Sequence, residues 1–137
     1  MFSFTADSSA DAVLTSITGS VAGSALSGSL NVNIVDNDTS AIVGSGTMVV
    51  GTGTALGSGL ITLNGSGLTV SAGTTKKLIV QINSASNLTQ GGGGSGGYKS
   101  FQFGITGFTF NDNGGSTSAS PFLPSISQPL NANTLQY

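Results

Sequence analysis

Side chains able to carry out chemistry are few in this chain. It has no His, Cys, Glu or Arg, and its only charged residues are three Lys and five Asp. Without His, a Ser nucleophile would need a Lys or an Asp as its general base, and a paired-carboxylate mechanism would need two of the Asp across one cleft. We therefore expect a protein that is not an enzyme and has no catalytic or cofactor-binding residue.

Two turns carry the hard oxygen ligands that calcium prefers. Asp36 and Asp38 lie in the first, at residues 36–39, and Asp112 lies in the second, at residues 111–113. Asp and Asn are also common in turns for a structural reason, because their side chains hydrogen-bond to the nearby backbone. We expect structural turns first, and we keep these three carboxylates as candidate calcium ligands. Zinc and iron are excluded in practice, since the chain has neither His nor Cys.

Two covalent modifications are compatible with the sequence. The acceptor pattern for an N-linked glycan begins at Asn37, Asn64 and Asn87. In a chain so rich in Asn, Ser and Thr, chance matches are expected, so these are candidates only if the source modifies its exported proteins. An internal isopeptide bond between a Lys and an Asn is also conceivable, with an Asp as the acid catalyst.

Low charge limits the partners and the setting of the protein. With a net charge of -2 and 6% charged residues, the chain offers no basic patch to a phosphate backbone, so we expect no nucleic-acid partner. A surface of Ser, Thr, Asn, Gln and Gly is unusual in the cytosol, where interspersed charges keep proteins apart, and it favours an extracellular or cell-surface location. No stretch predicts a membrane span or a signal peptide, so we expect a mature form or a fragment to which Met1 was added.

Apolar and polar residues alternate along most of the chain, which predicts strands and no helix. With 137 residues, 37% hydrophobic residues and 22 Gly, one domain with a thin core is expected. The sequence thus predicts an all-β, two-sheet sandwich of about 7–9 strands over residues 1–115. The expected strands are 2–6, 12–21, 30–34, 41–50, 60–63, 68–70, 78–82 and 98–110.

Local signals refine this prediction. Leu14 breaks the alternation of its strand and predicts a bulge or burial on both faces, and a change of parity between Gly104 and Gly107 predicts a bulge or a corner. An Asn64-Gly65 pair between apolar runs predicts a tight hairpin. Four of the seven Phe fall in residues 98–110, which we expect to be the central core strand. The Gly-rich stretch before it lacks the context of a phosphate-binding loop and predicts an exposed tip.

The last 22 residues, 116–137, differ from the rest because they contain all three prolines of the chain. Proline disfavours helix and central strands, so we expect an extended tail. Its apolar residues are more numerous than an exposed tail needs, and they predict that it packs on its own domain or on a neighbouring one. The candidate assembly residues are Phe122, Leu123, Ile126 and Leu130.

Residues 2–110 resemble an immunoglobulin-like module of microbial surface proteins, of the adhesin, S-layer or pilin-head type. The resemblance rests on the segments Phe2-Ser3-Phe4-Thr5-Ala6 with the residues 13–17 after it, residues 68–80, and Phe101-Gln102-Phe103-Gly104-Ile105. It implies an immunoglobulin-like sandwich with a scaffold or adhesive role, and it carries no catalytic residues. The Gly-rich stretch and the proline-containing tail depart from the usual module.

These observations lead to one expectation and its alternatives. We expect a structural subunit or module of a cell-surface filament, pilus, layer or adhesin that associates with itself or with neighbouring modules through strand edges or the tail. The alternatives are a surface module that binds glycan or calcium, and a viral capsid or fibre protein. A sugar platform is disfavoured, since the chain has no Trp.

Overall fold

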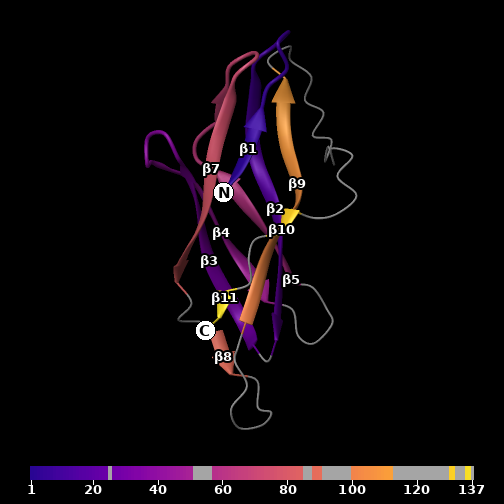
Figure 1. Ribbon diagram of the computed structural model, residues 1–137, viewed down its shortest axis with the longest axis vertical. Coiled ribbons are helices and arrows are strands. Elements are labelled where there is room, and N and C mark those ends of the chain that lie inside the picture. Colours follow the sequence, from indigo (N-terminus) through magenta and orange to yellow (C-terminus); the bar gives the residue numbers. More distant parts are fainter. Residues whose placement is uncertain are drawn as a thin grey trace.

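The computed structural model describes residues 1–24, 26–50, 57–84, 88–90, 100–112, 130–131 and 135–136. All regular structure in these ranges is β, which confirms the all-β prediction (Figure 1). The strands are β1 (Phe2–Thr5), β2 (Ala12–Ser24), β3 (Leu26–Asp36), β4 (Ile42–Val50), β5 (Gly57–Leu63), β6 (Leu68–Val70), β7 (Thr75–Ser84), β8 (Leu88–Gln90), β9 (Ser100–Asp112), β10 (Leu130–Asn131) and β11 (Leu135–Gln136). The described ranges contain no helix long and apolar enough to span a membrane.

The strands form one continuous antiparallel sheet that curls around a main buried cluster, with a second, small cluster of Ala6, Ala12 and Val70. Its order is β1-β7-β3-β4-β5-β2-β9-β10, with β8 also on β3, β6 also on β2 and β11 also on β9. In Figure 1 the long strands run along the length of the molecule, and β1 lies in front of the sheet between β7 and β9. This arrangement is consistent with the two facing layers of a sandwich, while the immunoglobulin-like identity stays a prediction.

β4 and β5 approach each other closely at a place that we call the corner of the sheet, where inward positions are occupied by Gly. A Cβ atom on Gly46 would lie 2.5 Å from the carbonyl oxygen of Leu60, and one on Gly59 would lie 2.6 Å from that of Thr47. Such contacts are shorter than any side chain tolerates, so the two strands approach this closely only because these positions lack a Cβ. Gly at these inward positions therefore allows the close approach of β4 and β5.

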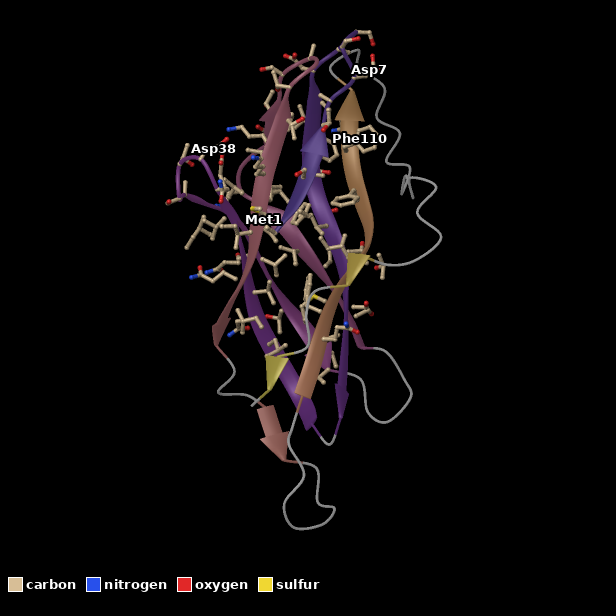
Figure 2. All side chains as sticks on the ribbon, in the orientation of Figure 1. Met1, Asp7, Asp38 and Phe110 are labelled. Atoms are coloured by element: carbon tan, nitrogen blue, oxygen red, sulfur yellow. The ribbon has the colours of Figure 1, made fainter. Side chains whose placement is uncertain are left out.

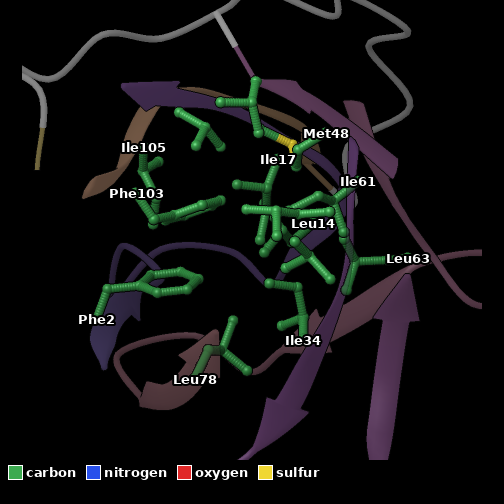
Figure 3. Close-up of a cluster of buried hydrophobic side chains, with 14 residues drawn as sticks. Phe2, Leu14, Ile17, Ile34, Met48, Ile61, Leu63, Leu78, Phe103 and Ile105 are labelled. Atoms are coloured by element: carbon green, nitrogen blue, oxygen red, sulfur yellow. The ribbon is translucent and has the colours of Figure 1, made fainter. Parts of the chain in front are cut away.

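The core fills the space inside the curl with aliphatic side chains and Phe (Figure 3). Met48 and Phe103 meet over Gly19 of β2, where a Cβ atom would lie 2.7 Å and 2.9 Å from them. Large side chains thus take up the room that this Gly leaves. The main buried cluster comprises Phe2, Leu14, Ile17, Val21, Leu30, Val32, Ile34, Met48, Val50, Ile61, Leu63, Leu78, Phe103 and Ile105.

Two bulges interrupt the long β2–β9 ladder, and at both places the structure selects the bulge from the two alternatives that the sequence left open. The register shifts between Leu14 and Ser16, and again where Thr18 and Gly19 face Gly107 and Ile105. The extra residue is Thr15 in β2 and Thr106 in β9. Their hydroxyls donate across the ladder to the carbonyls of Thr109 at 3.1 Å and Thr18 at 3.2 Å. In each bulge, the residue without a partner in the register is therefore a threonine, and its hydroxyl stabilises the bulge by a hydrogen bond to the other strand.

Two expectations about strand placement are wrong. Asn64-Gly65 forms a turn, with Gly65 at φ +60°, but no hairpin, because β5 and β6 both pair antiparallel with β2 and so run in the same direction. The turn shifts the chain sideways between two sites on one neighbour. β9 lies near the end of the strand order and is not central in the sheet, although its Phe103 is buried as expected for a core strand.

The two ends of the strand order meet through aromatic rings. Phe2 and Phe4 of β1 both contact Phe108 of β9, with ring centroids 5.8 Å and 6.1 Å apart, and Phe4 also contacts Phe110 at 6.0 Å. No ladder joins β1 to β9 in the described residues. Ring packing, which stabilises such pairs by about 0.5–1.5 kcal/mol beyond area burial, holds the curl together here.

Candidate functional site

Asp36 ends β3 and is the one buried carboxylate among the described side chains, at 4% exposed. One oxygen accepts the Asp38 backbone N–H at 2.9 Å, and the other accepts the Lys76 ammonium of β7 at 3.0 Å. Burial raises the pKa of Asp36, but the Asp38 N–H and the Lys76 ammonium outweigh this and lower it below the ordinary 3.8. The group is therefore ionised and paired at neutral pH.

The backbone around Asp36 explains this geometry. The Asp36 N–H donates to the Ala41 carbonyl at 2.9 Å, and the Asp36 carbonyl accepts the Ser40 N–H at 2.8 Å. Ser40 takes a positive φ of 58° to close the turn. Asn37 donates its N–H to the Lys77 carbonyl at 2.9 Å, which attaches the turn to β7. The Asp-rich sequence here thus builds the connection from β3 to β4, as turn statistics predict.

The candidate calcium ligands do not form a cluster in the part of the chain that is described. Asp36 uses both carboxylate oxygens within the protein, and Asp38 is exposed on the projecting turn (Figure 2). Asp112 ends β9, where its backbone faces Ala12 of β2. No group of three His, Cys, Asp or Glu side chains that could hold a metal ion occurs among the residues searched. Calcium binding at these residues stays a prediction.

Two further Asp residues fix the loop between β1 and β2. Asp7 accepts both the backbone N–H and the hydroxyl of Ser9, at 2.8 Å and 2.6 Å, and these bonds lower its pKa, the hydroxyl bond most. Asp11 accepts the Ala72 N–H at 2.8 Å and so ties this loop to the turn before β7. In Figure 2 Asp7 lies near the top of the molecule, and Asp38 lies lower, on the turn that projects to the left. Asp7 and Asp11 both have structural partners.

Lys76 and Asp36 are the only pair that brings an amine and a carboxyl group together among the described side chains. Their contact is an ion pair, in which the Lys76 ammonium donates to the Asp36 carboxylate at 3.0 Å. An isopeptide bond between a Lys and an Asn stays a prediction. Lys77 is exposed on β7, and Lys99 lies outside the described residues.

The candidate glycan acceptors lie in turns where they can be placed. Asn37 is exposed in the β3–β4 turn. Asn64 is also exposed, and its side-chain amide donates to the Ile42 carbonyl at 2.9 Å. Asn87 lies outside the described residues. The exposure of Asn37 and Asn64 is what attachment would require, and attachment itself stays a prediction.

The candidate assembly residues are only partly placed. Leu130 belongs to β10, whose backbone pairs antiparallel with β9 at Ile105, and β11 pairs with β9 at Phe101 and Ser100. Phe122, Leu123 and Ile126 lie outside the described residues. Two short pieces of the C-terminal segment therefore add to the edge of β9 by backbone pairing.

The outer face of β4 and β5 is a feature that the sequence analysis missed. Its outward residues are exposed and uncharged: Ser45, Thr47 and Val49 on β4, and Ser58, Leu60 and Thr62 on β5. Val49 and Leu60 are 57% and 56% exposed, and Ile42 at the start of β4 is 51% exposed. The Gly residues of the two strands face inward, so the side chains between them lie on the opposite, outer face. In the sequence, Gly alternates with other residues in both strands, and this pattern could have predicted one face with side chains and one with few.

Comparison with known proteins adds no relative. No protein-family model, no curated protein and no solved structure matches the chain.

Proposed function

We propose that this protein is a non-enzymatic structural subunit or module of an extracellular or cell-surface assembly, which associates with copies of itself or with neighbouring modules through strand edges or the tail. The alternative is a surface module that binds glycan or calcium, and a viral capsid or fibre protein would use the same assembly chemistry.

The observation that carries the proposal is the pairing of β10 and β11 with β9. Two segments of two residues each from the C-terminal region pair with β9 through backbone hydrogen bonds. This edge of the sheet can therefore pair with an additional extended segment. Strand addition of this kind links protein molecules when the added segment comes from a neighbour.

The exposed face of β4 and β5 supports the same conclusion. It combines hydroxyl side chains with the apolar residues Val49 and Leu60 and bears no charge. A second molecule can therefore approach this face closely with little charge repulsion. Enzyme chemistry gains no such support, since three of the four described carboxylates, Asp7, Asp11 and Asp36, serve turns and one ion pair.

Light scattering and negative-stain microscopy of the full chain test the proposal. We expect filaments or high-order oligomers that disappear in the variant Phe122→Asp/Ile126→Asp, because charges replace two apolar anchors. The matched control Ser118→Asp/Ser120→Asp adds the same charge beside them and should still assemble. A monomer at all concentrations would reject assembly and direct attention to calcium titration and glycan screening.

A further inference from the structure

β1 is attached to the rest of the sheet by few contacts of its own. It pairs with β7 over four residues, from Phe2 opposite Leu78 to Thr5 opposite Thr75. On its inner side Phe2 is 8% exposed and packs with Phe4 against the rings of β9. The strand therefore fills a site bounded by β7 on one side and by the aromatic residues of β9 on the other.

The second edge of β1 has no partner strand in the described ranges. Ala6 donates its N–H to the Thr74 carbonyl at 3.1 Å. Since hydrogen-bonded pairs alternate in an antiparallel ladder, Phe2 and Phe4 exchange bonds with β7, and Ser3 and Thr5 direct their backbone groups away from it. Among the described residues, β1 is thus paired with a neighbouring strand, β7, along one of its two edges.

A short exposed loop connects β1 to the body of the protein. Within the loop, Asp7 accepts two bonds from Ser9. Two more bonds attach the loop to the turn before β7: the Asp7 carbonyl accepts the Gly73 N–H at 2.9 Å, and the Asp11 carboxylate accepts the Ala72 N–H at 2.8 Å. Such a loop can act as a hinge, because rearranging it breaks the bonds to this turn and the small cluster of Ala6, Ala12 and Val70, and leaves the main buried cluster in place.

We propose that β1 is exchanged between copies of this chain, so that β1 of one copy occupies the site between β7 and β9 of the next. This rests on the proposed function and specifies its donor and acceptor. The occupant is a second copy because the site is already seen to fit this segment, with Phe2, Phe4 and Ala6 as its buried or half-buried side chains.

The energetics favour exchange at high concentration. The exchanged strand makes the same contacts with β7 and β9 as before, so only the hinge and the entropy of association differ between the two states. Within one chain the strand competes at the effective concentration that residues 7–11 provide. Because each copy gives one strand and receives one from another, the exchange forms open chains or closed rings.

Cysteine cross-linking tests the exchange directly. Ser3 and Lys77 face one another in a pair that does not exchange hydrogen bonds, and both are exposed. The Cα atoms of such a pair are about 4.5 Å apart, within the range that a disulfide spans. The chain has no Cys of its own. We would mix Ser3→Cys chains with Lys77→Cys chains, unfold and refold them together over a concentration series, and oxidise them mildly.

Exchange predicts a disulfide-linked dimer of one chain of each kind, with a yield that rises with protein concentration. The matched control replaces Lys77→Cys with Gln81→Cys, an exposed site on the same strand that lies out of register with Ser3, and measures random cross-linking. A yield for the first pair no greater than for the control would overturn the proposal.

A second variant separates this proposal from the proposed function. Ser3→Cys/Lys77→Cys in one chain, oxidised at high dilution, locks β1 onto its own β7, which mass spectrometry verifies. The locked chain should remain monomeric and assemble only after reduction. If it assembles like the unmodified chain, exchange of β1 is wrong and assembly by another edge stands. If the unmodified chain never assembles, the proposed function fails, and the cross-linking yield alone decides the exchange.

Discussion

Replacing Gly46 with Ala should strongly destabilise the fold. The new Cβ atom would lie 2.5 Å from the Leu60 carbonyl oxygen and 2.9 Å from the Ile61 Cα atom, both backbone atoms of the adjacent strand. Ordinary contacts begin at 3.4 Å, so β5 would have to retreat by roughly 1 Å from a strand with which it is hydrogen-bonded. No side-chain rotation relieves the contact.

The size of the effect follows from two opposing contributions. Overpacking a well-filled region destabilises by about 1–3 kcal/mol and occasionally more, and a clash with backbone belongs at the upper end. Ala restricts the unfolded chain and returns about 0.4–1 kcal/mol. The net loss is about 2–3 kcal/mol, which for a chain of this length lowers Tm by about 7–10 °C.

Thermal unfolding followed by circular dichroism measures this shift. Gly107→Ala is the matched control, because a Cβ atom there meets only Thr18, at 3.8 Å and 3.9 Å. That variant should melt within about 3 °C of the parent, or slightly above it. Equal melting temperatures for Gly46→Ala and Gly107→Ala would refute the explanation of the sheet corner given above.

Two further predictions concern polar groups. Lys76→Met leaves Asp36 buried without its cation and should destabilise by about 1–2 kcal/mol at pH 7, a value reduced because Lys76 is 30% exposed. The folded pKa of Asp36 lies below 3.8, so the stability that its ion pair with Lys76 contributes is complete above pH 3.8 and is lost as the pH falls through the folded pKa. The denaturant curves of the parent and Lys76→Met should therefore converge in acid. A difference in stability that stays constant with pH would contradict the ion pair. Thr106→Val removes the hydroxyl bond to the Thr18 carbonyl and should lower the free energy of unfolding by about 0.5–1.5 kcal/mol, whereas Thr106→Ser keeps the hydroxyl and should keep most of the stability; an unchanged stability of Thr106→Val would show that the hydroxyl bond does not stabilise the bulge.

Features that the sequence predicted correctly depend on local pattern. The breaks of parity at Leu14 and near Gly107 located both bulges, because an extra residue in one strand shifts every later side chain to the other face. The Asp36 to Ser40 turn followed from the residue types that favour turns. In each case neighbours along the chain determine the structure.

Features that the sequence did not reveal depend on which strands become neighbours. The Asn64-Gly65 pair gives a turn with positive φ, but the same turn serves a hairpin or a sideways shift, and only the pairing of β5 and β6 with β2 decides between them. The ion pair of Asp36 with Lys76 joins residues 40 positions apart. Gly46 carried no sign in the sequence that it would face a carbonyl of β5.

The corner and the join of the sheet affect the molecule in different ways. The corner between β4 and β5 bends the ladder that carries the core, so a change at Gly46 affects the stability of the whole fold. At the join, β1 meets β9 through rings alone, but its release removes its contacts with β7 and β9 and takes Phe2 out of the main buried cluster. A β1 from another copy would restore all these contacts. A substitution in the hinge, at Asp11 for example, should therefore alter the balance between closed and exchanged β1, whereas Gly46→Ala should destabilise both forms.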